Sequence, residues 1–464
     1  MEKFDVVVIG AGPGGYPAAI RAAQLGASVA IVEKELAGGT CLNWGCIPTK
    51  SLIACSDLVA HLQHARDFGV TAGSVSIDYA AMIARKNAIV EKLRSGVEGL
   101  LKANKVTLIR GAASFQTRNR LSVRDAAGAQ LALETRATIV ATGSVSAMPG
   151  FIPRHERVLE SRAFLDLAKL PASLLILGGG VIGCEFACMA AQLGVKVTVV
   201  ELLEDILMMV DADVRREVRT HMERKLGIRV LTGKALQAIA PTAAGVSGKC
   251  GDETLTADLL LVAIGRKPAS AGLNLEGVGV KVTETGHIGT DDYARTSAAS
   301  IFAIGDVTGR AQLAHAATSQ GVTAAENAIL KTQRRIDPLV PSCIFTAPEI
   351  GSVGLTEVNA REEGLNVKIG KFSFTFLGKA MAAGCNAGFV KWVVDAGTDR
   401  LLGAHAVGPH ATELIAEATA AIRAELTAEE LGRTVHCHPT LSESWMEAAH
   451  AVHDACIHIP PKRG

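Results

Sequence analysis

Two long stretches of the chain repeat one pattern of apolar and polar positions. Residues 4–33 read FDVVVIGAGPGGYPAAIRAAQLGASVAIVE, and residues 172–201 read ASLLILGGGVIGCEFACMAAQLGVKVTVVE. They align without a gap, 168 residues apart, and share the pentapeptide Ala-Ala-Gln-Leu-Gly. Each passes from a continuous apolar run through a glycine turn and an alanine-rich segment to a second apolar run. Continuous apolar strands are typical of parallel sheets buried on both faces, so each stretch predicts a β-α-β unit.

Further apolar runs indicate where these units end. A strand-like run at 137–140 is followed by Ala-Thr-Gly, and the similar Ala-Ile-Gly-Arg occupies 263–266. The segment IFAIGDVTG (301–309) has the pattern of a closing strand for the first unit. The second unit is therefore expected to interrupt the first.

The last part of the chain has a different pattern. After the proline-bearing stretch 335–341, short alternating runs at 372–376 and 389–394 predict strands, and alanine-rich segments predict helices. This pattern indicates a separate α+β region. We predict a first domain at 1–142, a second at 143–268, a segment completing the first at 269–336, and a last domain at 337–464.

Each β-α-β unit carries a Gly-x-Gly-x-x-Gly motif between its first strand and its helix. The glycines are Gly10, Gly12 and Gly15 in the first unit and Gly178, Gly180 and Gly183 in the second. Such a motif allows a tight turn, a close approach of a pyrophosphate and tight helix packing, although a lone match is as often a packed turn. Here both motifs have the same flanks, and an acid, Glu33 or Glu201, follows 23 residues after the first glycine. The chain is thus predicted to be an α/β protein with two Rossmann-like dinucleotide-binding domains. Glu201 would repel the additional phosphate of NADP, which predicts NAD at the second site.

Charge and hydropathy exclude some classes of partner. The 47 basic and 46 acidic residues leave a net charge of +1, which gives no overall field for binding nucleic acid. Mean hydropathy is +0.27, yet the longest uncharged stretches, such as 137–153, are broken by Gly, Ser and Pro, so no membrane span is expected. No signal segment is seen before the first strand, and the ten cysteines are mostly scattered. A cytoplasmic, reducing location is therefore expected.

One tight pair of cysteines follows the first nucleotide motif, in the string GGTCLNWGCIPTK. Cys41 and Cys46 could close a small ring if both lay at the start of one helix, where the helix dipole favours a thiolate. The alternatives are two structural cysteines or half of a zinc site completed by His436 and His438. We favour a redox pair because it directly follows a nucleotide cradle, and we predict no metal.

The string HPTLSE near the C-terminus places an imidazole, His438, and a carboxylate, Glu443, on either side of a turn. A neighbouring carboxylate orients an imidazole and stabilises its charged form, as a thiol-deprotonating base requires. From the residues alone, a His-x-His pair is more often structural.

Taken together, GAGPGG, GGTCLNWGCIPTK, GGGVIGCE, AIGR, FAIGDV, LAHAA and HPTLSE resemble, in this order, the motifs of the pyridine nucleotide–disulfide oxidoreductases. The chain is most similar to members that oxidise dihydrolipoamide. The resemblance implies FAD and NAD as cofactors and a homodimer formed by a C-terminal α+β dimerisation domain. It also implies, as partners, the lipoyl domains of acyltransferases or glycine cleavage carrier proteins.

The resemblance also implies roles for individual residues. Cys46 would face the flavin and Cys41 would exchange with substrate, while His438 and Glu443 of one subunit would act as the base for the other. Lys50 would lie near the reactive nitrogen of the flavin, paired with Glu185. The implied FAD-binding residues are Gly10, Gly12, Gly15, Glu33, Lys34, Gly39, Thr40, Lys50, Gly111, Thr142, Gly143, Ser144, Asp306, Gln312, Leu313, Ala314 and His315. The implied NAD-binding residues are Gly178, Gly180, Val181, Ile182, Gly183, Glu185, Glu201 and Gly265.

Other functions agree less well with these residues. Glu201 disfavours an NADPH-dependent glutathione reductase, a mercuric reductase would end in a cysteine pair, and a soluble transhydrogenase lacks both redox cysteines. A protein that only binds the cofactors has no need of the complete reactive set. Trp44 and Pro17 depart from the residues usual in the family, and Trp44 could alter access to the cysteine pair.

Overall fold

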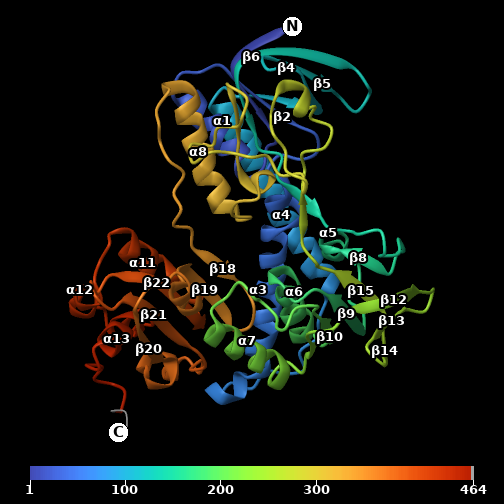
Figure 1. Cartoon of the computed structure of the whole chain (residues 1–464). Coiled ribbons are helices and arrows are strands. Elements are labelled where there is room, and N and C mark those ends of the chain that lie inside the picture. Colours follow the sequence, from blue (N-terminus) through green and yellow to red (C-terminus); the bar gives the residue numbers. More distant parts are fainter. Residues whose placement is uncertain (461–464) are drawn as a thin grey trace.

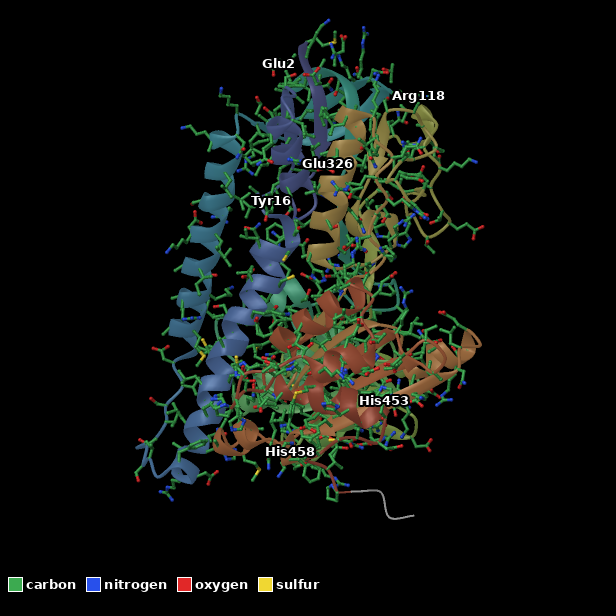
Figure 2. All side chains as sticks on the ribbon, turned by 90° about the vertical axis from the view of Figure 1, so that its left-hand side faces the viewer. Glu2, Tyr16, Arg118, Glu326, His453 and His458 are labelled. Atoms are coloured by element: carbon green, nitrogen blue, oxygen red, sulfur yellow. The ribbon has the colours of Figure 1, made fainter. Side chains whose placement is uncertain are left out.

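The computed structural model describes residues 1–460 and consists of three packed units (Figure 1). The last four residues of the predicted last domain lie outside the described range. In Figure 1 the first unit is at the top, and the second and the C-terminal units lie side by side below it. Figure 2 places Tyr16 and Glu326 in the upper unit and His453 and His458 in the lower, C-terminal one.

The first unit is built on a mostly parallel sheet. Strands β3, β2, β1 and β6 are parallel neighbours, β17 adds to β6 in the position predicted for a closing strand, and β5 and β4 continue the sheet antiparallel. The strands are β1 (Glu2–Ile9), β2 (Val29–Glu33), β3 (Thr107–Arg110), β4 (Ala112–Thr117), β5 (Arg120–Arg124), β6 (Gln130–Val140) and β17 (Ile301–Ala303).

Helices cover this sheet and connect the first unit to the others. Helices α1 and α8 pack against each other, and a carboxylate on α8, Glu326, accepts hydrogen bonds from Arg21 on α1. The long helices α3 and α4 run side by side down from this unit (Figure 1). The helical elements are α1 (Gly15–Gln24), α2 (Gly39–Trp44), α3 (Cys46–Gln63), η1 (Ala65–Phe68), α4 (Tyr79–Ala103), η2 (Glu276–Val278), η3 (Gly305–Thr308) and α8 (Ala314–Leu330).

The second unit has a fully parallel five-stranded sheet in the order β11-β10-β9-β15-β8. Its elements are β8 (Val158–Glu160), α5 (Ser161–Leu165), β9 (Ser173–Leu177), α6 (Val181–Gln192), β10 (Lys196–Val200), α7 (Ala212–Arg224), β11 (Arg229–Leu231) and β15 (Leu259–Val262), with an antiparallel ribbon of β12 (Leu236–Pro241), β13 (Val246–Cys250) and β14 (Glu253–Ala257). The repeat found in the sequence therefore folds as two equivalent units, with β1-α1-β2 corresponding to β9-α6-β10.

The chain enters and leaves the second unit through two paired strands. Strands β7 (Ser144–Ser146) and β16 (Arg266–Pro268) are antiparallel neighbours. The connection has two strands because the second unit is inserted between β6 and β17. We propose domain limits at 143, just before β7, and at 268, the last residue of β16.

The C-terminal unit is an antiparallel sheet in the order β18-β19-β22-β21-β20, packed against α11 and α13. Its elements are β18 (Ser342–Ile344), β19 (Glu349–Gly354), α9 (Glu357–Glu362), β20 (Val367–Ser373), η4 (Phe374–Phe376), α10 (Gly378–Ala382), β21 (Phe389–Asp395), β22 (Leu401–Gly408), α11 (Ala411–Arg423), α12 (Ala428–Arg433) and α13 (Glu443–Val452). The strand predicted at 372–376 is wrong in part. It ends at Ser373, whose hydroxyl accepts a hydrogen bond from the N–H of Thr375 and starts a 3-10 turn that buries Phe374 in the core.

Along the described part of the chain, no helix combines the length and the apolar character needed to cross a membrane.

Candidate active site

In the first glycine turn, the three positions of the motif have glycine for different physical reasons. A Cβ added at Gly10, where φ is +100°, would lie 2.4 Å from the carbonyl oxygen of Ala141, and one at Gly15 would lie 1.8 Å from that of Gly10. Both positions are thus required by the packing of the chain itself. A Cβ at Gly12 would meet nothing nearer than the Cα of Gly39 at 3.9 Å. A Cβ at Gly12 would thus make only an ordinary van der Waals contact, so the packing of the chain itself does not require glycine there.

The second turn repeats this arrangement. A Cβ at Gly178, where φ is +109°, would lie 2.4 Å from the carbonyl oxygen of Ala263, and one at Gly183 would lie 2.0 Å from that of Gly178. Gly180, at the start of α6, has no atom within 4 Å of an added Cβ. Open space at a helix N-terminus suits a phosphate group, because unpaired N–H groups and the helix dipole face it. Both turns therefore fit a dinucleotide.

The two acids that end the β-α-β units bind their own turns in the same way. Glu33 accepts a hydrogen bond from the N–H of Ala11 at 2.7 Å, and Glu201 accepts one from Gly179 at 2.6 Å. In each case the other carboxylate oxygen accepts an N–H two residues further along, at 2.8 Å. A carboxylate has about four acceptor positions, so each can still accept ribose hydroxyls.

Beyond the end of β6, several predicted flavin residues gather around one carboxylate. The hydroxyl of Thr142 is buried without a hydrogen-bond partner. Ser144 donates to Asp306 on η3, and Arg266 donates to the hydroxyl of Ser144 at 2.7 Å. A Cβ at Gly143 would meet no atom within 4 Å. Because a buried hydroxyl without a partner is costly, Thr142 indicates that a polar ligand belongs here.

The other predicted cofactor residues are distributed around the same two turns. Lys34 and Gln312 are exposed, and the exposed ring of His315 contacts the carbonyl oxygen of Pro341 at 2.7 Å. Gly111 follows β3 and donates its N–H to the carbonyl of Glu33. The remaining residues lie at helix starts or after a strand: Gly39 and Thr40 on α2, Leu313 and Ala314 at α8, Val181 and Ile182 on α6, and Gly265 after β15.

The cysteine pair lies where α2 meets α3, not at the start of one helix as predicted. Gly45 interrupts the helix with φ −140° and ψ −113°, so Cys41 belongs to α2 and Cys46 is the first residue of α3. A Cβ at Gly45 would lie 2.9 Å from the carbonyl oxygen of Thr40 and 3.3 Å from the Cα of Cys41. This close crossing brings the two cysteines together as free thiols that hydrogen-bond each other.

The surroundings make one of the two thiols acidic. The hydrogen bond from Cys41 and the positive charge of Lys50 outweigh burial and the negative charge of Glu185, and they lower the pKa of Cys46 to about 7. The same hydrogen bond and burial raise the pKa of Cys41 far above its usual range. Near neutral pH the negative charge of the pair therefore forms on Cys46, which is about half ionised at a pH equal to its pKa. This charge makes Cys46 a good leaving group in thiol–disulfide exchange.

Lys50 and Glu185 form the ion pair that the resemblance implies. The Lys50 ammonium lies 2.8 and 2.7 Å from the two oxygens of Glu185, whose side chain is 5% exposed. The backbone N–H of Phe345 also donates to Glu185, at 2.9 Å, and the Phe345 ring lies 4.6 Å from the ammonium. All three units thus meet at this pair, because Lys50 is on α3, Glu185 on α6 and Phe345 after β18.

The predicted base and its carboxylate are also in contact. His438 Nδ1 lies 2.8 Å from Glu443, which also accepts the N–H of Thr440, and the His438 side chain is 77% exposed. His436 instead bonds Glu417 at 2.6 Å. Both histidines of the zinc alternative thus have carboxylate partners. Within residues 1–460, no three His, Cys, Asp or Glu side chains are grouped as a metal site would require.

Sequence reasoning missed Phe345 and Arg266 as parts of the site. Phe345 acts through a backbone N–H and a ring face, and it is 160 residues from Glu185. No local pattern identifies such a residue. Arg266 had a signal, since it ends the Ala-Ile-Gly-Arg string, but its contact with Ser144 depends on the pairing of β7 with β16.

Comparisons with known proteins agree with this geometry. Residues 4–321 match the family model described as pyridine nucleotide-disulphide oxidoreductase, and residues 340–449 match the dimerisation domain of the same family. A dihydrolipoyl dehydrogenase from Chlamydia pneumoniae is 44% identical and covers 99% of both chains. One from Bacillus subtilis is 42% identical, covering 98% of this chain and 99% of its own.

Solved structures match over nearly the whole chain as well. LpdA from Mycobacterium tuberculosis has a TM-score of 0.89 at 29% identity, covering 97% of this chain and 99% of its own. The HOCl-induced flavoprotein disulfide reductase RclA from Escherichia coli has a TM-score of 0.88 at 30% identity, with the same coverage. The predicted architecture, with two Rossmann-like units and a C-terminal dimerisation domain, is confirmed. The chain belongs to the pyridine nucleotide-disulphide oxidoreductase family.

Proposed function

We propose that this chain is a dihydrolipoyl dehydrogenase, which oxidises protein-bound dihydrolipoyl groups and reduces NAD⁺ to NADH. The observation that carries the proposal is the close approach of Cys41 and Cys46 at the junction of α2 and α3, one turn of α3 before the Lys50–Glu185 ion pair, in a chain with two dinucleotide turns. A dithiol substrate needs such a pair to accept its electrons. The relatives named dihydrolipoyl dehydrogenase, at 40 to 44% identity over almost the whole chain, support this substrate over other disulfides.

Members of this family use FAD and a pyridine nucleotide, and this chain has a turn for each. We assign FAD to the turn at Gly12 with Glu33, Thr142 and Asp306, and NAD to the turn at Gly180. FAD, when bound, supplies a two-electron carrier between the dithiol and NAD⁺. The carboxylate of Glu201 disfavours the extra phosphate of NADP, so NAD is the expected nucleotide.

The cysteines exchange with the substrate by attack of one thiolate at a time. In the oxidised form, the first substrate thiolate attacks Cys41, forms a mixed disulfide and releases Cys46 as a thiolate. The positive charge of Lys50 stabilises this thiolate; in the dithiol form the hydrogen bond from Cys41 lowers the pKa of Cys46 most, and Lys50 lowers it further. The second substrate thiolate then attacks the first substrate sulfur, which is bonded to Cys41 in the mixed disulfide; this closes the lipoyl disulfide and releases Cys41. The substrate loses two electrons and two protons in these two exchanges. The electrons reduce the cysteine disulfide, and the protons pass to the base and to Cys41.

The chain carries the family's dimerisation domain, which supports a homodimer. We propose that His438 of one subunit is the base for the cysteine pair of the other. Its exposed ring is oriented by Glu443, and the loop that carries it precedes α13, which packs on β20 and β21 of the C-terminal unit. The helices of the cysteine pair pack instead on α4, α5 and α6.

For the partners, we propose lipoyl domains of acyltransferases in 2-oxoacid dehydrogenase complexes or of glycine cleavage carrier proteins. We also propose a cytoplasmic location, because the reactive thiols require a reducing compartment.

Steady-state kinetics test the function directly. The purified protein should reduce NAD⁺ with dihydrolipoamide much faster than it reduces glutathione disulfide with NADPH. A preference for glutathione disulfide and NADPH would overturn the assignment, and the NADP⁺ reaction with dihydrolipoamide separates an error in the nucleotide from an error in the dithiol.

A further inference from the structure

Trp44 lies between the two cysteines in the sequence, and its half-buried ring packs against a residue of the second unit. The guanidinium of Arg162, on α5, lies 3.9 Å from the centroid of the Trp44 ring. The same guanidinium donates a hydrogen bond to Glu35 at 2.9 Å. We call these three side chains the Trp44 stack. It joins α2, the loop after β2 and α5.

Helix α5 presents Arg162 from a fixed position. At its start, the Glu160 side chain accepts the N–H groups of Arg162 and Ala163 at 3.0 and 3.1 Å. At its end, the buried ammonium of Lys86, on α4, donates to the carbonyl oxygen of Leu165 at 2.7 Å. A helix held at both ends does not follow small movements of α2, so it can restrain them.

The beginning of α2 is held by a separate set of contacts. The amide of Asn43 donates to the carbonyl oxygens of Ala37 and Gly39, both at 2.9 Å, and accepts a hydrogen bond from Arg94 on α4 at 3.4 Å. These bonds fix the first turn of α2, which carries Cys41. At the other end of α2, the C-cap residue is Gly45, which has no side chain.

Trp44 is the last residue of α2, next to the crossing at Gly45. There the backbone of α3 approaches Cys41 so closely that a single added carbon at Gly45 would lie 3.3 Å from its Cα. A small rotation of this end of α2 changes the position of Cys41 relative to Cys46. Besides Cys41, the charged groups that face Cys46 are Lys50 and Glu185.

We propose that Trp44 is a positioning residue for the cysteine pair: held against Arg162, its ring fixes the end of α2 and thereby the contact between Cys41 and Cys46. Cation–π pairs of this kind prefer a guanidinium over a tryptophan face. The inference rests on the redox role of the pair in the proposed function, and it is independent of which dithiol is the substrate.

The test uses the holoenzyme reduced by dithiothreitol, in which a thiolate beside the flavin gives a long-wavelength absorbance band. In Trp44→Leu and Arg162→Gln, the pH midpoint of this band should rise by about 0.5 to 1 pH unit, because a weaker contact with Cys41 leaves the Cys46 thiolate less stabilised. Trp44→Phe, which keeps an aromatic face, should shift it by less. Arg295→Gln is the matched control, because it removes the guanidinium next to Tyr293, 5.1 Å from its ring centroid, outside the site.

Tryptophan fluorescence gives a second readout. Of the three tryptophans, Trp392 and Trp445 are fully buried, with ring centroids 4.7 Å apart, whereas Trp44 is half-buried and is separated from Cys46 in the sequence by one residue. The emission change on reduction should therefore be present in the wild type and in Arg295→Gln, and absent in Trp44→Phe.

Wild-type midpoints in both Trp44→Leu and Arg162→Gln would overturn the inference. Should Trp44→Leu not fold, Arg162→Gln decides alone, because this side chain is 47% exposed and its loss leaves the core intact. A wild type that forms the band but does not turn over dihydrolipoamide would contradict the proposed function and leave the inference standing. Normal turnover of dihydrolipoamide by the wild type, with wild-type midpoints in both variants, would support the proposed function and contradict the inference.

Discussion

Gly180→Ala separates what the second glycine turn needs for folding from what it needs for NAD. No atom lies within 4 Å of a Cβ built at Gly180, and its φ of −76° and ψ of −172° suit alanine. Replacing glycine stabilises by about 0.4–1 kcal/mol through the unfolded chain, while alanine is a poorer N-cap by a similar amount. The two effects offset each other, so the thermal midpoint should change by no more than about 2–4 °C.

The same methyl group would occupy the space where a phosphate must approach the backbone. Losing one hydrogen bond to a charged group costs about 1.5–3 kcal/mol, so the Kd for NAD⁺ should rise by roughly 10- to 150-fold. Calorimetric titration with NAD⁺ and thermal unfolding measure the two effects separately.

Gly183→Ala is the matched control. Its Cβ would lie 2.0 Å from the carbonyl oxygen of Gly178, so it should destabilise the fold by at least about 1–3 kcal/mol. Gly180→Ala contradicts this prediction if it binds NAD⁺ like the wild type, or if it unfolds as readily as Gly183→Ala.

Two further predictions concern charges. Lys50→Met should raise the pKa of Cys46 from about 7 toward the 9.0 of an ordinary thiol, so that its thiolate appears only at higher pH. Glu185→Gln should lower the same pKa, because it removes a negative charge. A pH titration of the long-wavelength band measures both shifts, and shifts of the same sign would contradict the assignment. Lys391→Met should lower the stability by about 3–5 kcal/mol, because it leaves the buried carboxylate of Asp211 without its cation, and thermal unfolding measures the loss.

The control for Lys391→Met is Arg433→Gln. Arg433 forms an exposed ion pair with Glu429 one helical turn away, and such surface pairs contribute about 0–1 kcal/mol. Equal thermal midpoints for the two variants would show that the buried pair between the second and C-terminal units is not needed for stability.

Local patterns in the sequence were enough to predict the turns and strands that surround the site. Both dinucleotide turns, the acids that follow them and the closing strand β17 depend on apolar periodicity and on glycines within about 30 residues, which is the range over which a β-α-β unit forms. The contact of His438 with Glu443 spans only a turn, and it too could be expected from spacing.

Contacts between units could not be predicted in this way. The N–H of Phe345 on Glu185 and the guanidinium of Arg162 over Trp44 join segments more than 100 residues apart, and neither has a local signature. The break at Gly45 was also missed, because a helix pattern continues through it and only the crossing of the backbone near Cys41 requires the glycine. The end of β20 at Ser373 depends on the burial of Phe374, which alternation alone does not reveal.

In the proposed mechanism, Cys46 carries the thiolate beside FAD and Cys41 exchanges with substrate. Absorbance spectra of Cys41→Ser and Cys46→Ser, before and after addition of dihydrolipoamide, test this claim most directly. We expect Cys41→Ser to show the long-wavelength band without any dithiol, Cys46→Ser never to show it, and neither variant to turn over. A Cys46→Ser variant that develops the band or keeps full turnover would contradict the account.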